Sequence, residues 1–270
     1  MGSDALLCVD GVSMAYRARR GEIQALSSLS FAVARGEFVS VIGPSGCGKS
    51  TLLKIVAGLV RPSAGEAVLD GRPVTGPRAD VGVVFQKPTL LPWKSVLENV
   101  LLPARALKLD MAAARKRAAA LLDLVDLGKF ANNYPGELSG GMQQRVGLAR
   151  MLVHDPAFLL MDEPFAALDA MTRESLTLEL QGIWLGSGKT VLFITHSIPE
   201  AVFLSDRVIM MSGRPGRVLK DVAIDLPRPR TLRTMGSAVF GDLCNTLRRD
   251  FMQNANHGND TLPSRKSVGG

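Results

Sequence analysis

The sequence predicts an α/β fold whose parallel sheet is covered by helices on both faces. Short, mostly apolar runs recur along the chain, helical patterns separate them, and a glycine-rich turn joins the first run to the helix after it. With 270 residues, of which 46% are hydrophobic and 21% charged, the chain is long and apolar enough to bury a core of this kind.

The apolar runs identify the strands of the predicted sheet. The first, FVSVI at residues 38–42, is rich in β-branched residues and leads through the glycine-rich turn into the helical pattern TLLKIVAGL. Comparable runs are VGVVF, FLLM and VLFIT, at residues 81–85, 158–161 and 191–195. Because helices separate these apolar strands, we expect them to pair in parallel in one sheet.

Two regions depart from this alternation of strands and helices. Residues 87–156 are mostly helical in pattern, with a stretch rich in Ala, Leu, Arg and Lys at 111–127, which predicts an inserted helical subdomain. The segments LLCVDGVSMAY and EAVLDGRPV, at residues 6–16 and 66–74, alternate around turn residues. They predict a small antiparallel sheet that flanks the parallel one.

The end of the chain has a different character. LPRPR, at residues 226–230, is a stop signal, and apolar residues then recur at helical spacing at positions 240, 243, 247 and 251. Beyond Asn254 little remains to bury, so we expect disorder. We therefore divide the chain into a domain of residues 1–227, with its helical subdomain at about 87–156, and a segment of residues 228–270 that holds a basic C-terminal helix and the tail.

Charge and cysteine content bound the function only loosely. The net charge of +7 and the pI near 9.6 fit nucleic acid, an anionic membrane surface or a phosphate ligand equally well. After position 227 the basic residues outnumber the acidic ones, and we expect a solvated face or an electrostatic contact there. The cysteines, Cys8, Cys47 and Cys244, lack metal spacing, so a zinc site or disulfide framework is not expected.

Nothing in the sequence predicts export or membrane insertion. No apolar run approaches the roughly 20 residues that cross a bilayer, and the first ten residues lack the basic start and apolar stretch of a signal peptide. We therefore expect the protein to stay in the cytoplasm, where the thiols remain reduced.

The segment GPSGCGKST fits the phosphate-loop pattern, with a strand before it and a helix after it. Its glycines let successive backbone N–H groups point at one anion, and the helix adds its positive end. Lys49 should reach the β- and γ-phosphates, and Ser50 should offer its hydroxyl to Mg²⁺. The simpler alternative is a glycine turn without a ligand. The predicted phosphate contacts are Gly43, Pro44, Ser45, Gly46, Cys47, Gly48, Lys49, Ser50 and Thr51.

Cys47 carries a separate prediction. It lies at a helix start, a position that favours the thiolate, so alkylation should block ATP binding and MgATP should protect the thiol.

Acidic and polar side chains follow the other predicted strands. Asp162 and Glu163 end the run FLLMDEP, where Asp162 can bind Mg²⁺ through water and Glu163 can polarise the attacking water. His196 follows VLFIT and Gln86 follows VGVVF. We expect these side chains to meet at one sheet edge, because parallel strands deliver ligand-binding residues at their carboxyl ends.

Each of these residues has a structural alternative. The acidic pair could be a solvated turn, and a lone histidine is usually structural. In the functional interpretation, His196 hydrogen-bonds the γ-phosphate, and Gln86 reaches Mg²⁺ or the water only while the terminal phosphate is present. Gln86 would then serve as a sensor.

The segment LSGGMQQR at residues 138–145 predicts a second anion site. Ser139, Gly140 and Gly141 stand at a helix start, where N–H groups lack partners and the helix dipole is positive. The phosphate loop already holds its own nucleotide, so the economical interpretation is that this segment binds the γ-phosphate of ATP held by another copy. Two copies would then sandwich two ATP molecules head to tail. The alternative is an ordinary glycine-containing helix cap.

Taken in order, GPSGCGKST, Gln86, LSGGMQQR, FLLMDEP, FAALD and His196 closely resemble the nucleotide-binding subunit of ATP-binding cassette transporters over residues 5–225. The resemblance implies a P-loop ATPase core with a parallel sheet, a small antiparallel β-subdomain and an inserted α-helical subdomain. It implies ATP and Mg²⁺ as cofactors, with Ser50, Gln86 and Asp162 as metal ligands. It also implies that Tyr16 stacks on adenine, that Gln143 contributes to the nucleotide site, and that Asp169 contacts the opposite subunit. Tyr16 could equally pack at a loop edge.

Local features resemble one group within that superfamily. KPTLLPWKSVLENV, MSGRPGRV and LPRPR are most similar to the subunits that power bacterial uptake of nitrate, taurine and alkanesulfonates. The apolar patch at residues 90–93 could receive a short helix of a membrane partner, or it could be buried in the core.

The resemblance implies an ATP-hydrolysing subunit on the cytoplasmic face of the bacterial inner membrane, which dimerises with ATP bound. Its partners would be separate permease subunits and, through them, a periplasmic or extracellular solute-binding protein, with no nucleic acid. A soluble cassette ATPase that acts on ribosomes or DNA is the alternative, although such relatives typically join two cassettes or insert coiled coils. A small-molecule kinase would share the phosphate loop but would have no use for LSGGMQQR.

Overall fold

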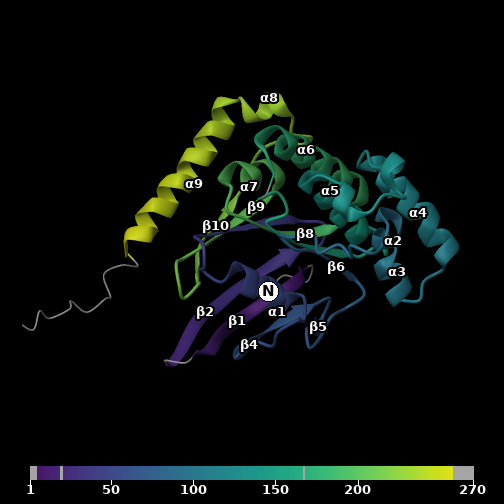
Figure 1. Ribbon diagram of the computed structural model, residues 1–270. Coiled ribbons are helices and arrows are strands. Elements are labelled where there is room, and N and C mark those ends of the chain that lie inside the picture. Colours follow the sequence, from purple (N-terminus) through teal and green to yellow (C-terminus); the bar gives the residue numbers. More distant parts are fainter. Residues whose placement is uncertain (1–4, 19–20, 167, 258–270) are drawn as a thin grey trace, which may run out of the picture.

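The computed structural model of the protein describes residues 5–18, 21–166 and 168–257, which form an α/β fold with two sheets (Figure 1). The main sheet has the strand order β10-β9-β3-β8-β7-β6, in which β10 at the edge is antiparallel to β9 and the other strands are parallel. Its strands are β3 (Phe38–Ile42), β6 (Val81–Val84), β7 (Phe158–Asp162), β8 (Thr190–Thr195), β9 (Arg207–Met211) and β10 (Val218–Ala223).

Helices cover both faces of the main sheet, which confirms the predicted fold class. Every residue of β3, β7 and β8 is buried, because apolar side chains on both sides of these strands face other elements. On one face lie α1 (Lys49–Val56) and the second sheet. On the other lie α6 (Ala170–Ser187), α7 (Ile198–Leu204) and α9 (Ala238–His257).

The second sheet is antiparallel, as predicted, and has the order β2-β1-β4-β5. Its strands are β1 (Ala5–Ala18), β2 (Gly21–Ala34), β4 (Ala64–Leu69) and β5 (Arg72–Pro73). Strand β2 was not predicted from the sequence. The first four residues of β2 are exposed, so its apolar alternation starts only at Ala25 and is interrupted by serines.

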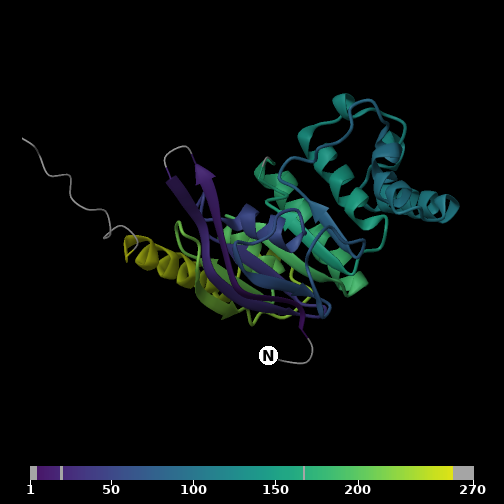
Figure 2. The ribbon, with the colours of Figure 1, turned by 90° about the horizontal axis from the view of Figure 1, so that it is seen from below.

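The helices between β6 and β7 pack around a core of their own, and the predicted bounds of the helical subdomain, 87–156, stay a prediction. The subdomain contains α2 (Val96–Val100), α3 (Leu102–Ala106), α4 (Met111–Leu124), two short 3₁₀ turns (Gly128–Phe130 and Pro135–Glu137) and α5 (Gly140–Leu152). Figure 2 shows α2, α3 and α4 to one side of the two sheets. Helix α5 belongs to two cores, since Val146 and Ala149 pack inside the subdomain whereas Leu148 and Leu152 pack against the main sheet's cluster.

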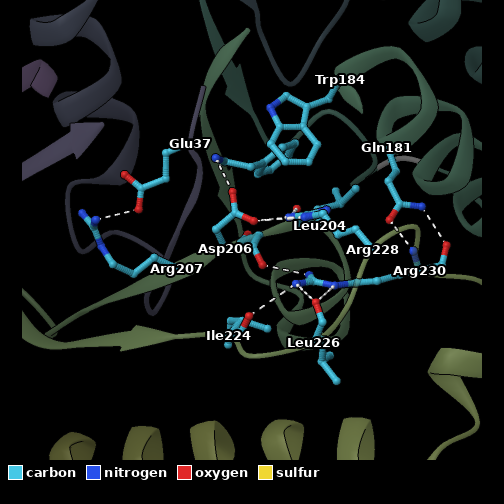
Figure 3. A network of polar contacts seen from close by, with 12 residues as sticks. Glu37, Gln181, Trp184, Leu204, Asp206, Arg207, Ile224, Leu226, Arg228 and Arg230 are labelled. Carbon is cyan, nitrogen blue, oxygen red and sulfur yellow. Dashed lines mark hydrogen bonds and ion pairs between the residues drawn. The ribbon is translucent and has the colours of Figure 1, made fainter. Parts of the chain in front are cut away.

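Both arginine side chains of the LPRPR segment contact other parts of the fold (Figure 3). Arg230 is only 1% exposed, and its guanidinium donates to the carbonyl oxygens of Val202 (2.8 Å), Phe203 (2.9 Å) and Ser205 (2.8 Å). These carbonyls end α7, where they lack helical donors and carry partial negative charge. Burial lowers the pKa of Arg230 to about 10, so the side chain remains charged at neutral pH.

Arg228 also anchors the LPRPR segment to the rest of the fold. Its guanidinium pairs with Asp206 at 2.8 Å, donates to the Leu204 carbonyl at 2.6 Å and lies 4.2 Å from the ring centre of Trp184. This stacking is a cation–π contact. Of the two alternatives expected for the basic residues after position 227, Arg228 and Arg230 follow the electrostatic contact and not the solvated face, because a carboxylate, carbonyls and an aromatic ring from distant parts of the chain surround them.

The predicted C-terminal helix is present; it follows the short helix α8 (Leu232–Met235) and packs against the helical face of the main sheet. The apolar side chains of Phe240, Cys244 and Leu247 on α9 are buried in the cluster that includes α7. Helix α9 continues to His257, three residues beyond the expected end of order at Asn254. The rest of the predicted disordered tail, residues 258–270, lies outside the described residues.

Among the helices that the structure describes, none combines the length and the apolar character that crossing a bilayer demands.

Candidate active site

The carboxyl ends of four neighbouring strands meet at one edge of the main sheet. The register pairs Ile42 of β3 with Thr195 of β8, Ile194 of β8 with Asp162 of β7, and Met161 of β7 with Val84 of β6. The segments that carry Gly43, His196, Glu163 and Gln86 begin at these ends. The predicted convergence on one sheet edge is therefore confirmed.

The phosphate loop between β3 and α1 depends on glycines in left-handed backbone conformations. Gly46 has φ +77° and Gly48 has φ +103°. A Cβ at Gly48 would lie 2.6 Å from Leu26 Cδ2 and 2.8 Å from the Ala25 carbonyl oxygen, so both conformation and space exclude a larger residue. The loop leads directly into the N-terminus of α1, an arrangement that suits an anionic ligand.

Lys49 is folded back over this loop. Its Nζ donates to the carbonyl oxygens of Gly43 (2.8 Å) and Pro44 (3.1 Å) and lies 3.9 Å from Glu163 Oε1. The side chain is only 6% exposed, so its ammonium is desolvated beside the loop amides. A buried ammonium at this place attracts a phosphate strongly.

Glu163 joins the other predicted catalytic residues. Its Oε2 lies 3.2 Å from His196 Nδ1 and 3.4 Å from Gln86 Nε2. Its backbone has φ +45°, which costs a non-glycine residue about 1–3 kcal/mol and persists only where the surroundings impose it. The backbone N–H donates to the Ile194 carbonyl at 2.8 Å, which ties this conformation to strand β8.

Asp162 and Ser50 form the candidate Mg²⁺ site. Burial raises the pKa of Asp162, a hydrogen bond from Ser50 lowers it, and the charge of Glu163 raises it further. A divalent cation would stabilise this buried carboxylate. Within the described ranges, no group of three or more His, Cys, Asp or Glu side chains could hold a metal ion. One carboxylate and one hydroxyl fit Mg²⁺, which commonly takes its remaining ligands from phosphates and water.

A cavity of about 360 Å³ opens over the phosphate loop. Its polar end is formed by residues of the loop together with Gln86 and Glu163, and its other end by Tyr16, Ile23 and Ala25. The Tyr16 hydroxyl lies 3.4 Å from Thr51 Oγ1, so the ring stands beside the loop. Ile23 and Arg214 also line this cavity, although no sequence motif identified either of them as a site residue.

Some predicted residues do not line the cavity. Gly43 and Pro44 act through the carbonyls that hold Lys49, whereas Asp162 contacts Ser50 and His196 contacts Glu163, and both of these partners line the cavity. Cys47 is 1% exposed and packs in the apolar core, and burial raises the pKa of its thiol. The prediction of a reactive thiolate at Cys47 is therefore wrong, because desolvation outweighs the helix start and the nearby Lys49.

This geometry reverses the labelling prediction. In the native protein at pH 7.5, Cys47 should react with iodoacetamide far more slowly than it does after denaturation, with or without MgATP, because the buried thiol stays protonated. Mass spectrometry of tryptic peptides measures the rate. Labelling of Cys47 as fast in the native as in the denatured protein would contradict its burial.

The LSGGMQQR segment forms a separate site at the start of α5. Ser139 caps the helix, its Oγ accepting from the Met142 N–H at 3.3 Å. Asp169 caps α6 in the same way and accepts from the Thr172 N–H at 3.0 Å, a bond that lowers the pKa of Asp169. A cavity of about 510 Å³ is lined by Ser139, Gly140, Gly141, Met142, Arg145, Leu168, Asp169 and Thr172.

Gln143 does not line this cavity. Its side-chain amide donates to the carbonyl oxygens of Pro135 (2.9 Å) and Leu138 (3.3 Å), the loop that precedes α5. These hydrogen bonds hold the Gln143 side chain on the segment that precedes Ser139, and its contact with a nucleotide stays a prediction.

The two cavities share no lining residue, so the phosphate loop and LSGGMQQR of one chain do not form one site. Residues 26–166 match the family described as ABC transporter. The chain belongs to the ABC transporter family. As a member of this family, the subunit is an ATPase.

Members of this family resemble the chain over most of its length. It is 49% identical to the taurine import ATP-binding protein TauB of Burkholderia pseudomallei, over 83% of this chain and 86% of that protein. It is 44% identical to the aliphatic sulfonates import ATP-binding protein SsuB of Bacillus cereus, over 83% and 88%. Among solved structures, the ATP-binding cassette MJ0796, a dimer bound to ADP and Pi, is 35% identical with a TM-score of 0.73, over 82% of this chain and all of that one.

Proposed function

We propose that this chain powers a bacterial importer of taurine, aliphatic sulfonates or a related small solute, through the closure of two copies around two ATP molecules. The observation that carries the proposal is the separation of the two cavities, each of which offers half of a nucleotide site. The similarity to taurine and sulfonate import subunits supports the solute class. Nitrate, which the sequence analysis also named, stays a prediction.

In this proposal the phosphate loop holds the nucleotide and Glu163 is the general base. Lys49 neutralises phosphate charge, and Tyr16 stacks on the base. Glu163 accepts a proton from the attacking water, while His196 and Gln86 orient its carboxylate through the contacts at 3.2 and 3.4 Å. Ser50, Asp162 and Gln86 would hold Mg²⁺, which supplies charge stabilisation to the transferring phosphoryl group when bound.

The second half-site acts on the nucleotide of the partner copy. The first amides of α5 have no acceptor within the helix, and Ser139 keeps a hydroxyl proton to donate while its oxygen caps the helix. The amides and the Ser139 hydroxyl can donate to the terminal phosphate of ATP only when two copies face each other. Asp169 lies in the same cavity and would face the partner across this contact. ATP therefore favours the closed dimer, and loss of the terminal phosphate favours opening.

Paired variants separate the two half-sites. Lys49→Ala should weaken ADP binding by about a hundredfold, since it removes a buried charge-assisted contact. Ser139→Asp should leave ADP affinity unchanged but abolish ATP-induced dimers, because aspartate caps the helix as serine does yet repels phosphate. Calorimetry measures affinity, and gel filtration with ATP in the Glu163→Gln background measures dimers. Equal loss of ADP affinity in both variants would place the phosphate loop and LSGGMQQR in one site and would contradict the head-to-tail dimer.

The patch at residues 90–93 is a candidate contact for the permease. Trp93 is 70% exposed, whereas Leu90 is partly buried against the helical subdomain. The buried side chain of Asn99 fixes the loop, since its Oδ1 accepts from the Leu91 N–H at 2.7 Å and its Nδ2 donates to the Leu91 carbonyl at 3.1 Å. Core burial, the alternative for this patch, does not apply to Trp93.

The loop before the patch is tied to α5. Arg150 donates to the carbonyls of Pro88 and Thr89, which connects the helix of LSGGMQQR to the segment between Gln86 and Trp93. Closure of the dimer would therefore move the patch against a membrane partner.

Purification from membranes tests the transport role. In detergent extracts, a tagged chain should co-purify with a multi-span protein, and a solute-binding protein loaded with taurine or an alkanesulfonate should stimulate the ATPase activity of the complex. This outcome requires the chain to lie on the cytoplasmic face of the inner membrane. Recovery with ribosomes or DNA and no membrane partner would favour the soluble cassette ATPase instead.

A further inference from the structure

We propose that Arg214 is an additional nucleotide-binding residue, which donates to the phosphate chain from the side of the cavity opposite β7. The inference rests on nucleotide binding in the cavity over the phosphate loop. Arg214 lines that cavity together with Tyr16 and Lys49, and its Nε donates to the Gly46 carbonyl oxygen at 3.3 Å. The Arg214 guanidinium therefore contacts the phosphate loop, although Arg214 lies 168 residues after Gly46 in the sequence.

The loop that carries Arg214 is rigidly attached to the phosphate loop. It joins β9 to β10, and its ends pair through the Ser212 N–H and the Arg217 carbonyl at 2.9 Å. The Gly216 N–H donates to the Ala25 carbonyl at 2.9 Å, and the Gly216 carbonyl accepts from the Ser27 N–H at 3.0 Å. Two backbone hydrogen bonds therefore join the loop to β2.

Close packing completes this attachment. A Cβ at Gly216 would lie 2.1 Å from the Cys47 carbonyl oxygen, a distance that no side chain tolerates. The backbone at Gly216 therefore rests directly on the backbone of the phosphate loop. Arg214, two residues earlier, is held in place by the scaffold and not only by its own hydrogen bond.

The charge of the cavity depends on Arg214. Its charged lining side chains are Lys49, Glu163 and Arg214. Lys49 and Glu163 lie 3.9 Å apart and offset each other, so Arg214 supplies the net positive charge. Within the described ranges no carboxylate pairs with Arg214, and the Nε–H is the only guanidinium donor with a protein acceptor. The remaining donors suit phosphate oxygens, which arginine binds well.

The same loop provides a matched control. Arg217 is exposed and carries the same charge, but it does not line the cavity. A variant of Arg217 therefore changes the net charge of the protein equally without removing a group from the site.

Titration with ADP in the absence of Mg²⁺ tests the proposal by binding alone. Arg214→Ala should weaken ADP binding by about tenfold, the loss of roughly one charge-assisted hydrogen bond. Arg214→Lys should recover part of the affinity, and Arg217→Ala should match the wild type. The affinity of Arg214→Ala should also depend less on NaCl, because one screened contact is gone. Support of Gly46 alone would leave that salt dependence unchanged.

The remaining outcomes distinguish this inference from the proposed function. Loss of ADP binding in Lys49→Ala together with wild-type affinity in Arg214→Ala would overturn the role of Arg214 and leave the cassette site intact. Unchanged ADP affinity with weaker ATP-induced dimers would assign Arg214 to the partner copy and overturn the inference as well. If Arg214→Ala fails to fold, Arg214→Gln, which keeps the length of the side chain, is titrated in its place.

Discussion

Glu163→Gln is expected to slow ATP hydrolysis by about a hundredfold to a thousandfold while ATP binding survives. The amide matches the carboxylate in shape, so the contacts with His196 and Gln86 can persist, but it cannot accept a proton from water. The nearby ammonium of Lys49, 3.9 Å from Oε1, loses a competing negative charge, which favours retention of the nucleotide.

Two measurements check this result. Phosphate release gives the rate, and gel filtration with MgATP should show a dimer that the wild type forms only transiently. Glu174→Gln is a matched control, because Glu174 is an exposed residue on α6 and does not line the cavity. Hydrolysis by Glu163→Gln at the wild-type rate would refute the assignment of the general base.

Arg230→Met is expected to lower the free energy of unfolding by at least about 3 kcal/mol, since each buried carbonyl left without a donor costs about 1–3 kcal/mol. Methionine fills similar space but donates no hydrogen bond. The carbonyls of Val202, Phe203 and Ser205 at the end of α7 would all lose their donor. Gln181, which pairs with the Arg230 backbone N–H and carbonyl at 2.8 and 2.7 Å, would remain in contact.

Urea denaturation followed by circular dichroism measures the loss. Arg233→Met serves as the control, because Arg233 lies in the same segment but is exposed, and its unfolding free energy should change little. A wild-type unfolding midpoint in Arg230→Met would show that water satisfies these carbonyls and that Arg230 does not hold the C-terminal segment on the cassette.

Arg230 also connects stability to the active site. Helix α7 starts one residue after the cap Ser197, which follows His196 directly, and it ends at the carbonyls that Arg230 binds. The C-terminal segment therefore fixes one end of the helix whose other end positions the histidine. The basic residues after position 227 thus include fold-determining contacts, not only surface charge.

Much of the candidate site was predictable because its residues lie at the ends of strands. A buried apolar run followed by glycines, an acidic pair or a histidine places those residues at the carboxyl edge of a parallel sheet, whatever the rest of the chain does. The loop requires a left-handed backbone conformation at position 48, and glycine adopts it readily. For Lys49, Glu163 and Gln86, local sequence and strand order together were sufficient.

Other features depend on contacts that the motifs themselves do not specify. The environment of Cys47 was predicted from its helix start, but apolar neighbours from several elements bury it and reverse the expected pKa direction. Gln143 was grouped with its motif, yet its amide binds the preceding loop. Neither outcome follows from the nearest neighbours along the chain.

The α/β class, the helical insertion and the motifs at the strand ends were predictable from the sequence, because hydrophobic periodicity and glycine conformations are local properties. The burial of Arg230 against α7 and the contact of Arg214 with Gly46 became known only from the three-dimensional fold. Burial and charge pairing depend on which distant backbones approach each other, and residue spacing alone does not specify those approaches.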